Sequence, residues 1–134
     1  MTTKLTTCTS GSNSTNADLE VTASLYERED GSRYIEATWS AYGCAEIYYD
    51  DPSNPTPVNC NDAKVTVKLI EPINMLGDEY EYDGCSKSRT INFDVPSNSD
   101  TYKIKMNYDV WCVAPISGIV LGSGSTFCYC VLDV

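Results

Sequence analysis

The sequence predicts an all-β domain, an antiparallel β-sandwich of about seven to eight strands with an immunoglobulin-like or jelly-roll-like arrangement. Three observations predict it. Apolar and polar residues alternate over most of the chain, turn residues separate the runs, and there are seven cysteines and no histidine. The length of 134 residues fits one domain. We expect a disulfide-braced sandwich at residues 18–134, preceded by an N-terminal arm at residues 1–17.

The N-terminal arm differs from the rest of the chain in composition. Thr, Ser and Asn dominate residues 1–17, and Leu5 is their only large aliphatic side chain. Such a segment buries too little apolar area to order itself, so one interpretation is a flexible terminus. Threonine also favours strands, and residues 4–9 could pair with an open sheet edge. The sequence therefore predicts a flexible or strand-donating arm.

Residues 18–41 predict a β-hairpin, because two alternating runs flank a turn at Asp30-Gly31. The apolar positions of the two runs are Leu19, Val21, Ala23 and Leu25, then Ile35, Ala37, Trp39 and Ala41.

The remaining strands are expected at residues 44–49, 63–71, 78–82, 88–95, 101–111 and 126–134. We expect a loop at residues 50–62, where Pro52, Pro55 and Pro57 exclude a regular ladder, and a second loop at residues 122–125. No run shows a convincing helical period. Trp39 and Trp111 are expected in the core.

Six cysteines lie in the expected sandwich, and we expect them to form its disulfides: Cys44, Cys60, Cys85, Cys112, Cys128 and Cys130. Cys128 and Cys130 are two residues apart on one strand, so both side chains face the same way and cannot bond each other. Six cysteines allow fifteen connectivities, and the sequence cannot choose among them.

Cys8 is the unmatched cysteine in this scheme, and it lies alone in the arm. We expect it to form a disulfide with another chain, next to Leu5 as the apolar residue of the contact. Two alternatives remain open. Cys8 could pair within its own chain and leave a different cysteine over, or it could stay unpaired.

Cysteine content and charge limit the surroundings and partners. Disulfides persist in oxidising compartments, so we expect an extracellular or cell-surface protein. The first residues lack the apolar stretch of a signal peptide, which leaves three explanations: removal, another secretion route, or an intracellular protein with reduced thiols. The net charge of −10 disfavours nucleic acid. No membrane-spanning stretch is expected.

Catalytic, metal and cofactor chemistry is not expected. A carboxylate cluster at Asp78, Glu79, Glu81 and Asp83, with Asp50 and Asp51, could bind calcium, but a solvated sheet edge explains it better. Zinc is disfavoured because Cys128 and Cys130 are the only close cysteine pair. Without histidine, a Ser-His-Asp or Cys-His arrangement is excluded, so we expect no enzyme.

Two further patterns concern the surface. Ten tyrosines are many for this length, and a subset could form a sugar- or protein-binding surface. That subset is Tyr48, Tyr49, Tyr80, Tyr82 and Tyr129. Asn13-Ser14-Thr15 fits the N-glycosylation acceptor pattern, so a glycan at Asn13 is a further expectation.

These observations give two functional hypotheses. The first is a structural protein, the self-assembling subunit of an extracellular filament or pilus-like appendage, whose arm adds a strand to the next copy. The second is a secreted monomeric module that binds carbohydrate or a protein partner. The first hypothesis names copies of the chain itself as partners, and neither requires a cofactor.

Overall fold

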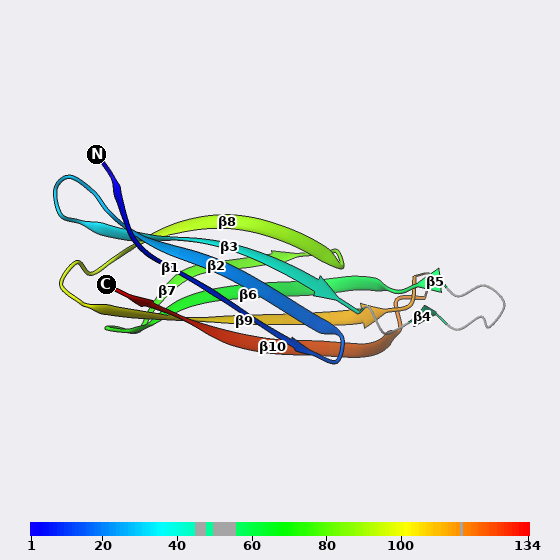
Figure 1. Ribbon diagram of the computed structural model, residues 1–134. Coiled ribbons are helices and arrows are strands. Elements are labelled where there is room, and N and C mark those ends of the chain that lie inside the picture. The colour runs from blue at the N-terminus through cyan, green and yellow to red at the C-terminus, as the bar shows by residue number, and fades with distance from the viewer. Residues whose placement is uncertain (45–47, 50–55, 116) are drawn as a thin grey trace.

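The computed structural model describes residues 1–44, 48–49, 56–115 and 117–134. Two four-stranded antiparallel sheets pack face to face (Figure 1). The first has the order β1 (Thr3–Ser14), β2 (Ala17–Glu27), β3 (Arg33–Gly43), β8 (Ser86–Val95). The second has the order β10 (Val120–Asp133), β9 (Thr101–Val113), β6 (Asn59–Glu71), β7 (Met75–Tyr82).

A separate two-stranded ladder joins β4 (Tyr48–Tyr49) and β5 (Thr56–Pro57). The prediction of an all-β, sandwich-like fold is confirmed, with eight antiparallel strands in the two sheets. The finer expectation of an immunoglobulin-like or jelly-roll-like type stays a prediction.

The core follows from the alternation of side chains along each strand. Every second residue of β2, β3 and β9 is buried between the sheets, and polar residues take the outer positions. Trp39 is completely buried. Trp111, in contrast, is 48% exposed, so its predicted place in the core is wrong. Its position on β9 has the same parity as Lys103 and Lys105, which points it outward.

Several strands begin earlier than expected, including β7 at Met75 and β8 at Ser86, and the difference is largest for β6 and β10. β6 starts at Asn59, and β10 includes the predicted loop at residues 122–125. β9 is long enough to pair with the early residues of both β6 and β10, and it places Trp111 opposite Ser123 of β10. Gly124 is required by a close approach: a Cβ built there would lie 2.4 Å from the Asn16 carbonyl oxygen. The glycine-serine pattern therefore marks a close contact between two elements rather than a turn.

Two expectations lie partly or wholly outside the described residues. A strand was expected at residues 44–49, and among the described residues of this range only β4 (Tyr48–Tyr49) forms one. Pro52 and Pro55, two of the three prolines expected to exclude a ladder, are outside the described residues. The third, Pro57, lies in β5 opposite Tyr48, so the prediction is wrong at that residue.

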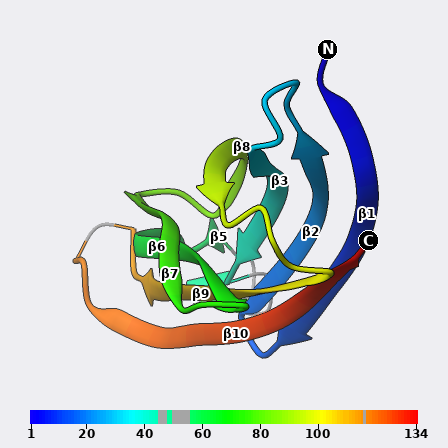
Figure 2. The same ribbon diagram turned by 90° about the vertical axis from the view of Figure 1, so that its left-hand side faces the viewer.

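The structure does not confirm a separate N-terminal arm. Most of residues 1–17 form β1, which pairs with β2 in register from Thr3–Glu27 to Ser14–Ala17. Figure 2 shows β1 at one side of the sandwich, with the C-terminal end of β10 beside it. β1 therefore belongs to the first sheet, at its outer edge.

The contrast between the two tryptophans gives a first prediction. Replacing Trp39 by Ala removes a fully buried side chain and should lower the free energy of unfolding by about 3–5 kcal/mol. Urea denaturation monitored by circular dichroism measures this change. Trp111→Ala, at the half-exposed position, is the matched control and should cost about 1 kcal/mol or less. Equal losses for both variants would contradict the burial described above.

Candidate functional site

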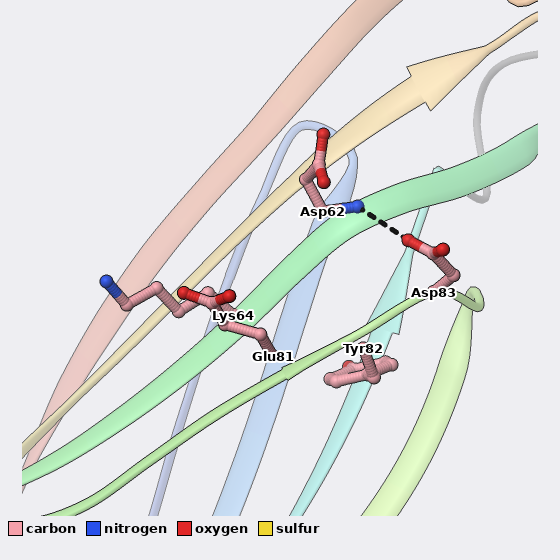
Figure 3. Close-up of a pocket in the computed structure, with 5 residues that line it drawn as sticks. All are labelled: Asp62, Lys64, Glu81, Tyr82 and Asp83. Atoms are coloured by element: carbon pink, nitrogen blue, oxygen red, sulfur yellow. Dashed lines mark hydrogen bonds between the residues drawn. The ribbon is translucent and has the colours of Figure 1, made fainter.

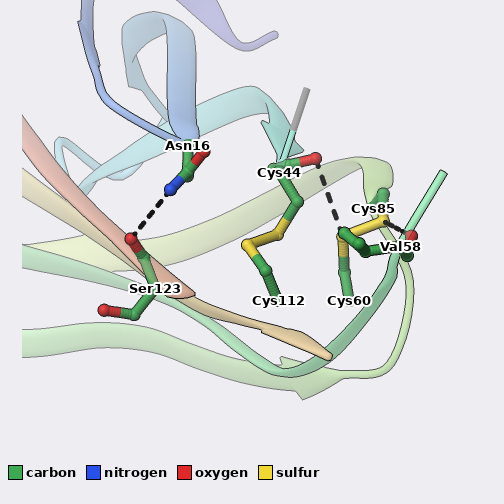
Figure 4. Close-up of a disulfide and its surroundings, with 8 residues drawn as sticks. Asn16, Cys44, Val58, Cys60, Cys85, Cys112 and Ser123 are labelled. Carbon is green, nitrogen blue, oxygen red and sulfur yellow. Dashed lines mark hydrogen bonds between the residues drawn. A yellow bond between two sulfur atoms is a disulfide. The ribbon is translucent and has the colours of Figure 1, made fainter. Parts of the chain in front are cut away.

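Three disulfides connect strands that are distant in the sequence: Cys8–Cys130, Cys44–Cys112 and Cys60–Cys85. The first joins β1 to β10, and the second joins the end of β3 to β9, so both link the two sheets. Figure 4 shows the Cys44–Cys112 and Cys60–Cys85 bonds close together, near the Asn16–Ser123 contact. Three disulfides indicate an oxidising, extracellular-type environment.

Cys8 does not have the expected partner. It bonds Cys130 of the same chain, with the Cα atoms 5.9 Å apart, and the free cysteine is the buried Cys128. The predictions that Cys8 is the unmatched cysteine and that Cys128 is bonded are therefore wrong for this structure. Cys128 and Cys130 both face inward, and the position of β1 decides which of them meets Cys8. Burial raises the pKa of the Cys128 thiol, partly offset by a hydrogen bond with Ser10.

Polar side chains and one disulfide join β1 to β10 along what we call the β1–β10 seam. The seam consists of Cys8, Ser10, Ser12, Ser14 and Asn16 on one side, and Ser123, Ser125, Thr126, Cys128 and Cys130 on the other. Ser12 and Thr126 share a hydrogen bond of 2.7 Å between their hydroxyl oxygens. The Ser14 hydroxyl donates to the Ser125 carbonyl at 2.7 Å. β10 pairs through its backbone with β9 alone among the described strands, so side chains hold the seam.

The turn between β1 and β2 lies at one end of the seam. Asn16 adopts a φ of 66°, in the left-handed region that Asn tolerates better than most residues. Its side-chain amide donates to the Ser123 carbonyl at 3.2 Å (Figure 4). Its own carbonyl accepts from the Cys44 backbone N–H at 2.9 Å. These contacts fix the turn to the second sheet and to the end of β3.

β1 contributes almost nothing to the core. The buried hydrophobic cluster is built from residues 17–132, and β1 adds only Leu5 and Cys8, both partly buried. The inward positions that follow along β1 are Ser10 and Ser12, which meet the seam instead of the apolar interior. The packed body and β1 are therefore two energetically distinct parts of the fold.

The carboxylate cluster of β7 is engaged with other groups. Glu79 pairs with Lys64 at 2.9 Å, Asp78 lies 3.5 Å from the Arg89 guanidinium, and Asp83 accepts from the Asp62 backbone N–H at 3.0 Å. The hydrogen bond with Glu79 is the main cause that raises the pKa of Lys64. Within the described residues, no group of three or more acidic or cysteine side chains is arranged to hold a metal ion. Asp50 and Asp51 lie outside the described residues.

A shallow depression lies beside these carboxylates (Figure 3). It is lined by Asp62, Lys64, Glu81, Tyr82 and Asp83. Figure 3 shows the Lys64 ammonium and the Asp62 and Asp83 carboxylates directed to different sides.

The three described tyrosines of the expected surface do not lie together. Tyr80 and Tyr82 pack on the buried Trp39, with ring centroids 6.3 and 6.2 Å away. Tyr129 points outward from β10, at the other edge of the second sheet. The side chains of Tyr48 and Tyr49 lie outside the described residues. Asn13 is exposed on the outer face of β1, and its glycosylation stays a prediction.

The structure brings together one surface that the sequence reasoning missed, which we call the lysine–aromatic face. It comprises Lys68, Lys103, Lys105, Phe127, Tyr129 and Val131, from the outer side of β6, β9 and β10. Phe127, Tyr129 and Val131 are 52%, 41% and 43% exposed. The signal was present in the sequence, since residues 126–134 carry apolar side chains at both parities, and only one parity can face the core.

Comparison with known proteins does not indicate a function. No family model matches the chain, and no curated protein or solved structure matches it. Among the described residues, none lies in a helix that is long and apolar enough to cross a membrane.

The assignment of Cys128 as the free thiol gives a second prediction. Iodoacetamide at mildly alkaline pH should leave the native chain unmodified, because the thiol is buried and its pKa is raised. After unfolding in urea without reductant, mass spectrometry should find one adduct per chain, on Cys128. Cys128→Ser is the control and should give no adduct. An adduct on Cys8 or Cys130 would contradict the pairing described here.

Proposed function

We propose that this protein is an extracellular structural subunit that assembles with copies of itself by exchanging β1. One observation carries the proposal: β1 donates no fully buried side chain to the core, yet a complete ladder and a disulfide hold it in place. A strand with these properties can leave its own chain while the apolar interior stays packed.

The exchange uses contacts that the chain already makes. If β1 turns outward at Thr15 and Asn16, the position between β2 and β10 becomes free for β1 of a neighbouring copy. That strand would form the same ladder with β2 and the same Cys8–Cys130 bond, now between two chains. Leu5 would then be the apolar residue inserted into the neighbour. Because the donating and accepting surfaces differ, the contact need not close and can build an open fibre.

The turn sets the cost of exchange. Opening it breaks the two hydrogen bonds of Asn16, to Ser123 and from Cys44. It also requires that the Cys8–Cys130 bond be absent or opened at that moment. Exchange is therefore favoured before oxidation is complete and at high chain concentration, conditions that accompany folding outside the cytosol.

A second candidate function is a secreted binding module for carbohydrate or a protein partner. The observation that favours it is the exposed Phe127 and Tyr129, with lysine ammonium groups 4.7 and 4.6 Å from the two ring centroids. Aromatic rings in this setting offer a stacking surface. A module of this kind would keep its binding when Cys8 is replaced, whereas a subunit that exchanges β1 would lose its covalent oligomers.

Isotope mixing tests the exchange directly. Chains with natural and ¹⁵N-enriched nitrogen are reduced, mixed at high concentration and allowed to refold and oxidise in a glutathione buffer. Oligomers should then contain Cys8 peptides of one isotope bonded to Cys130 peptides of the other, detected by mass spectrometry after digestion. Monomers from the same mixture should contain same-isotope pairs only.

The matched control compares two single substitutions. Cys8→Ser should abolish the ladder of covalent oligomers on a non-reducing gel, whereas Cys128→Ser should leave it intact. If Cys8 is bonded only within its own isotope in every oligomer, or if Cys8→Ser leaves the ladder unchanged, β1 exchange is refuted.

A further inference from the structure

The outer faces of the two sheets differ in chemistry. On the first sheet, threonines lie in register across all four strands, from Thr9 through Thr22 and Thr38 to Thr90. The Thr38 and Thr90 hydroxyl oxygens are 2.8 Å apart, and those of Ser40 and Ser88 are 2.7 Å apart. Three carboxylates stand among these hydroxyls, and we call Asp18, Glu20 and Glu36 the acidic face.

The opposite side of the molecule carries the lysine–aromatic face. Lys103 lies over the Tyr129 ring, with its nitrogen 4.6 Å from the centroid, and Lys105 lies over Phe127 at 4.7 Å. Lys105 also stands directly opposite Lys68 across the β6–β9 ladder. Like charges in this position repel and destabilise a sheet, so a chain that keeps them gains if an anionic group lies nearby.

Neither set of charges forms an ion pair within the described part of the chain, although Glu71 stands opposite Lys103 on β6, and Glu79 and Asp109 line the same hollow as Lys68 and Lys105. No ion pair of Lys68, Lys103 or Lys105 occurs among the described residues, and the same holds for Asp18, Glu20 and Glu36. Ion pairs do form elsewhere, for example between Lys64 and Glu79. The two faces therefore present unpaired charges of opposite sign on opposite sides of one sandwich.

We propose that the lysine–aromatic face of one copy binds the acidic face of the next copy. Charge complementarity identifies a second copy of this chain as the occupant: the lysines meet carboxylates, while Phe127, Tyr129 and Val131 cover the threonine methyl groups and the hydroxyl row. Because the two faces lie on opposite sides, each copy presents one free face of each kind. Stacking therefore continues without closing.

This contact deepens the proposed function, on which it rests, by adding a reversible contact between faces to the covalent one. The net charge of −10 repels a second copy and an external polyanion alike at long range, so the local charges of the two faces choose between these occupants. The acidic face supplies the needed carboxylates at a defined position. The hydroxyls around them supply hydrogen-bond partners for lysine ammonium groups.

Reciprocal charge reversal tests the contact. The native, oxidised chain should show concentration-dependent association in sedimentation velocity at low salt, weakened at 0.5 M salt, where the Debye length is about 4 Å. K103E/K105E and E20K/E36K should each need at least about tenfold higher concentration to associate. An equal mixture of the two should regain the association of the unaltered chain, because each reversed face meets its complement on the other variant.

Three controls separate the explanations. K103R/K105R keeps both charges and should associate like the unaltered chain. Circular dichroism shows whether each variant is folded, and isotope mixing of Cys8–Cys130 pairs should be unchanged in all of them. If the Cys8–Cys130 pairs do not mix isotopes while the salt-dependent association remains, β1 exchange is refuted and the contact between faces is not.

The contact between faces is refuted by any of three results. The first is a native chain that sediments as a monomer at all concentrations in low salt. The second is a mixture of reversed variants that stays as weak as either alone. The third is a lysine–aromatic face that binds an anionic polysaccharide such as polygalacturonate but not a second copy of the chain.

Discussion

The Cys8–Cys130 bond is the constraint on which the arrangement of the chain ends depends. It joins the first and last strands over a separation of 122 residues and so closes nearly the whole chain into one loop. In the chain-entropy model a loop of about this length contributes about 5 kcal/mol to stability. The contribution acts at the β1–β10 seam, where hydroxyl groups meet and few apolar side chains are present to hold two sheets together.

The seam explains how one domain can have two separable parts. The interior between the sheets is closely packed around Trp39 and the apolar residues of β9, and the Cys44–Cys112 bond links the sheets at one end. β1 adds only two partly buried side chains to that interior, Leu5 and Cys8. β1 is attached by backbone hydrogen bonds to β2 and by the seam to β10, contacts that depend on geometry more than on buried area. An attachment of this kind can be reproduced by the same strand of another chain.

The two outer faces of the sandwich differ in charge and in chemistry. An acidic, hydroxyl-rich face and a basic, aromatic face lie back to back, separated by the core. Within one chain, Phe127 and Tyr129 contact each other and the lysines above them, yet both rings stay about half exposed. In the proposed contact between faces, a second copy would cover these rings and bring carboxylates to Lys105 and Lys68. The covalent exchange of β1 and the contact between faces are independent in physical terms, since one depends on thiol oxidation and the other on ionic strength.

The sequence by itself determined which side chains of each strand face inward, because alternation is a local property of extended backbone. It placed Leu19 through Leu25 and Ile35 through Ala41 correctly, and it put Cys128 and Cys130 on one face. The tertiary structure alone decided that Cys8 meets Cys130, because that choice depends on the register of β1 against a strand more than a hundred residues away. Composition suggested a flexible or strand-donating arm at residues 1–17, because a threonine-rich segment can pair with an open sheet edge but does not specify which edge. The order of β1 comes from the unpaired edge that β2 offers it, and no local pattern within the arm encodes that edge.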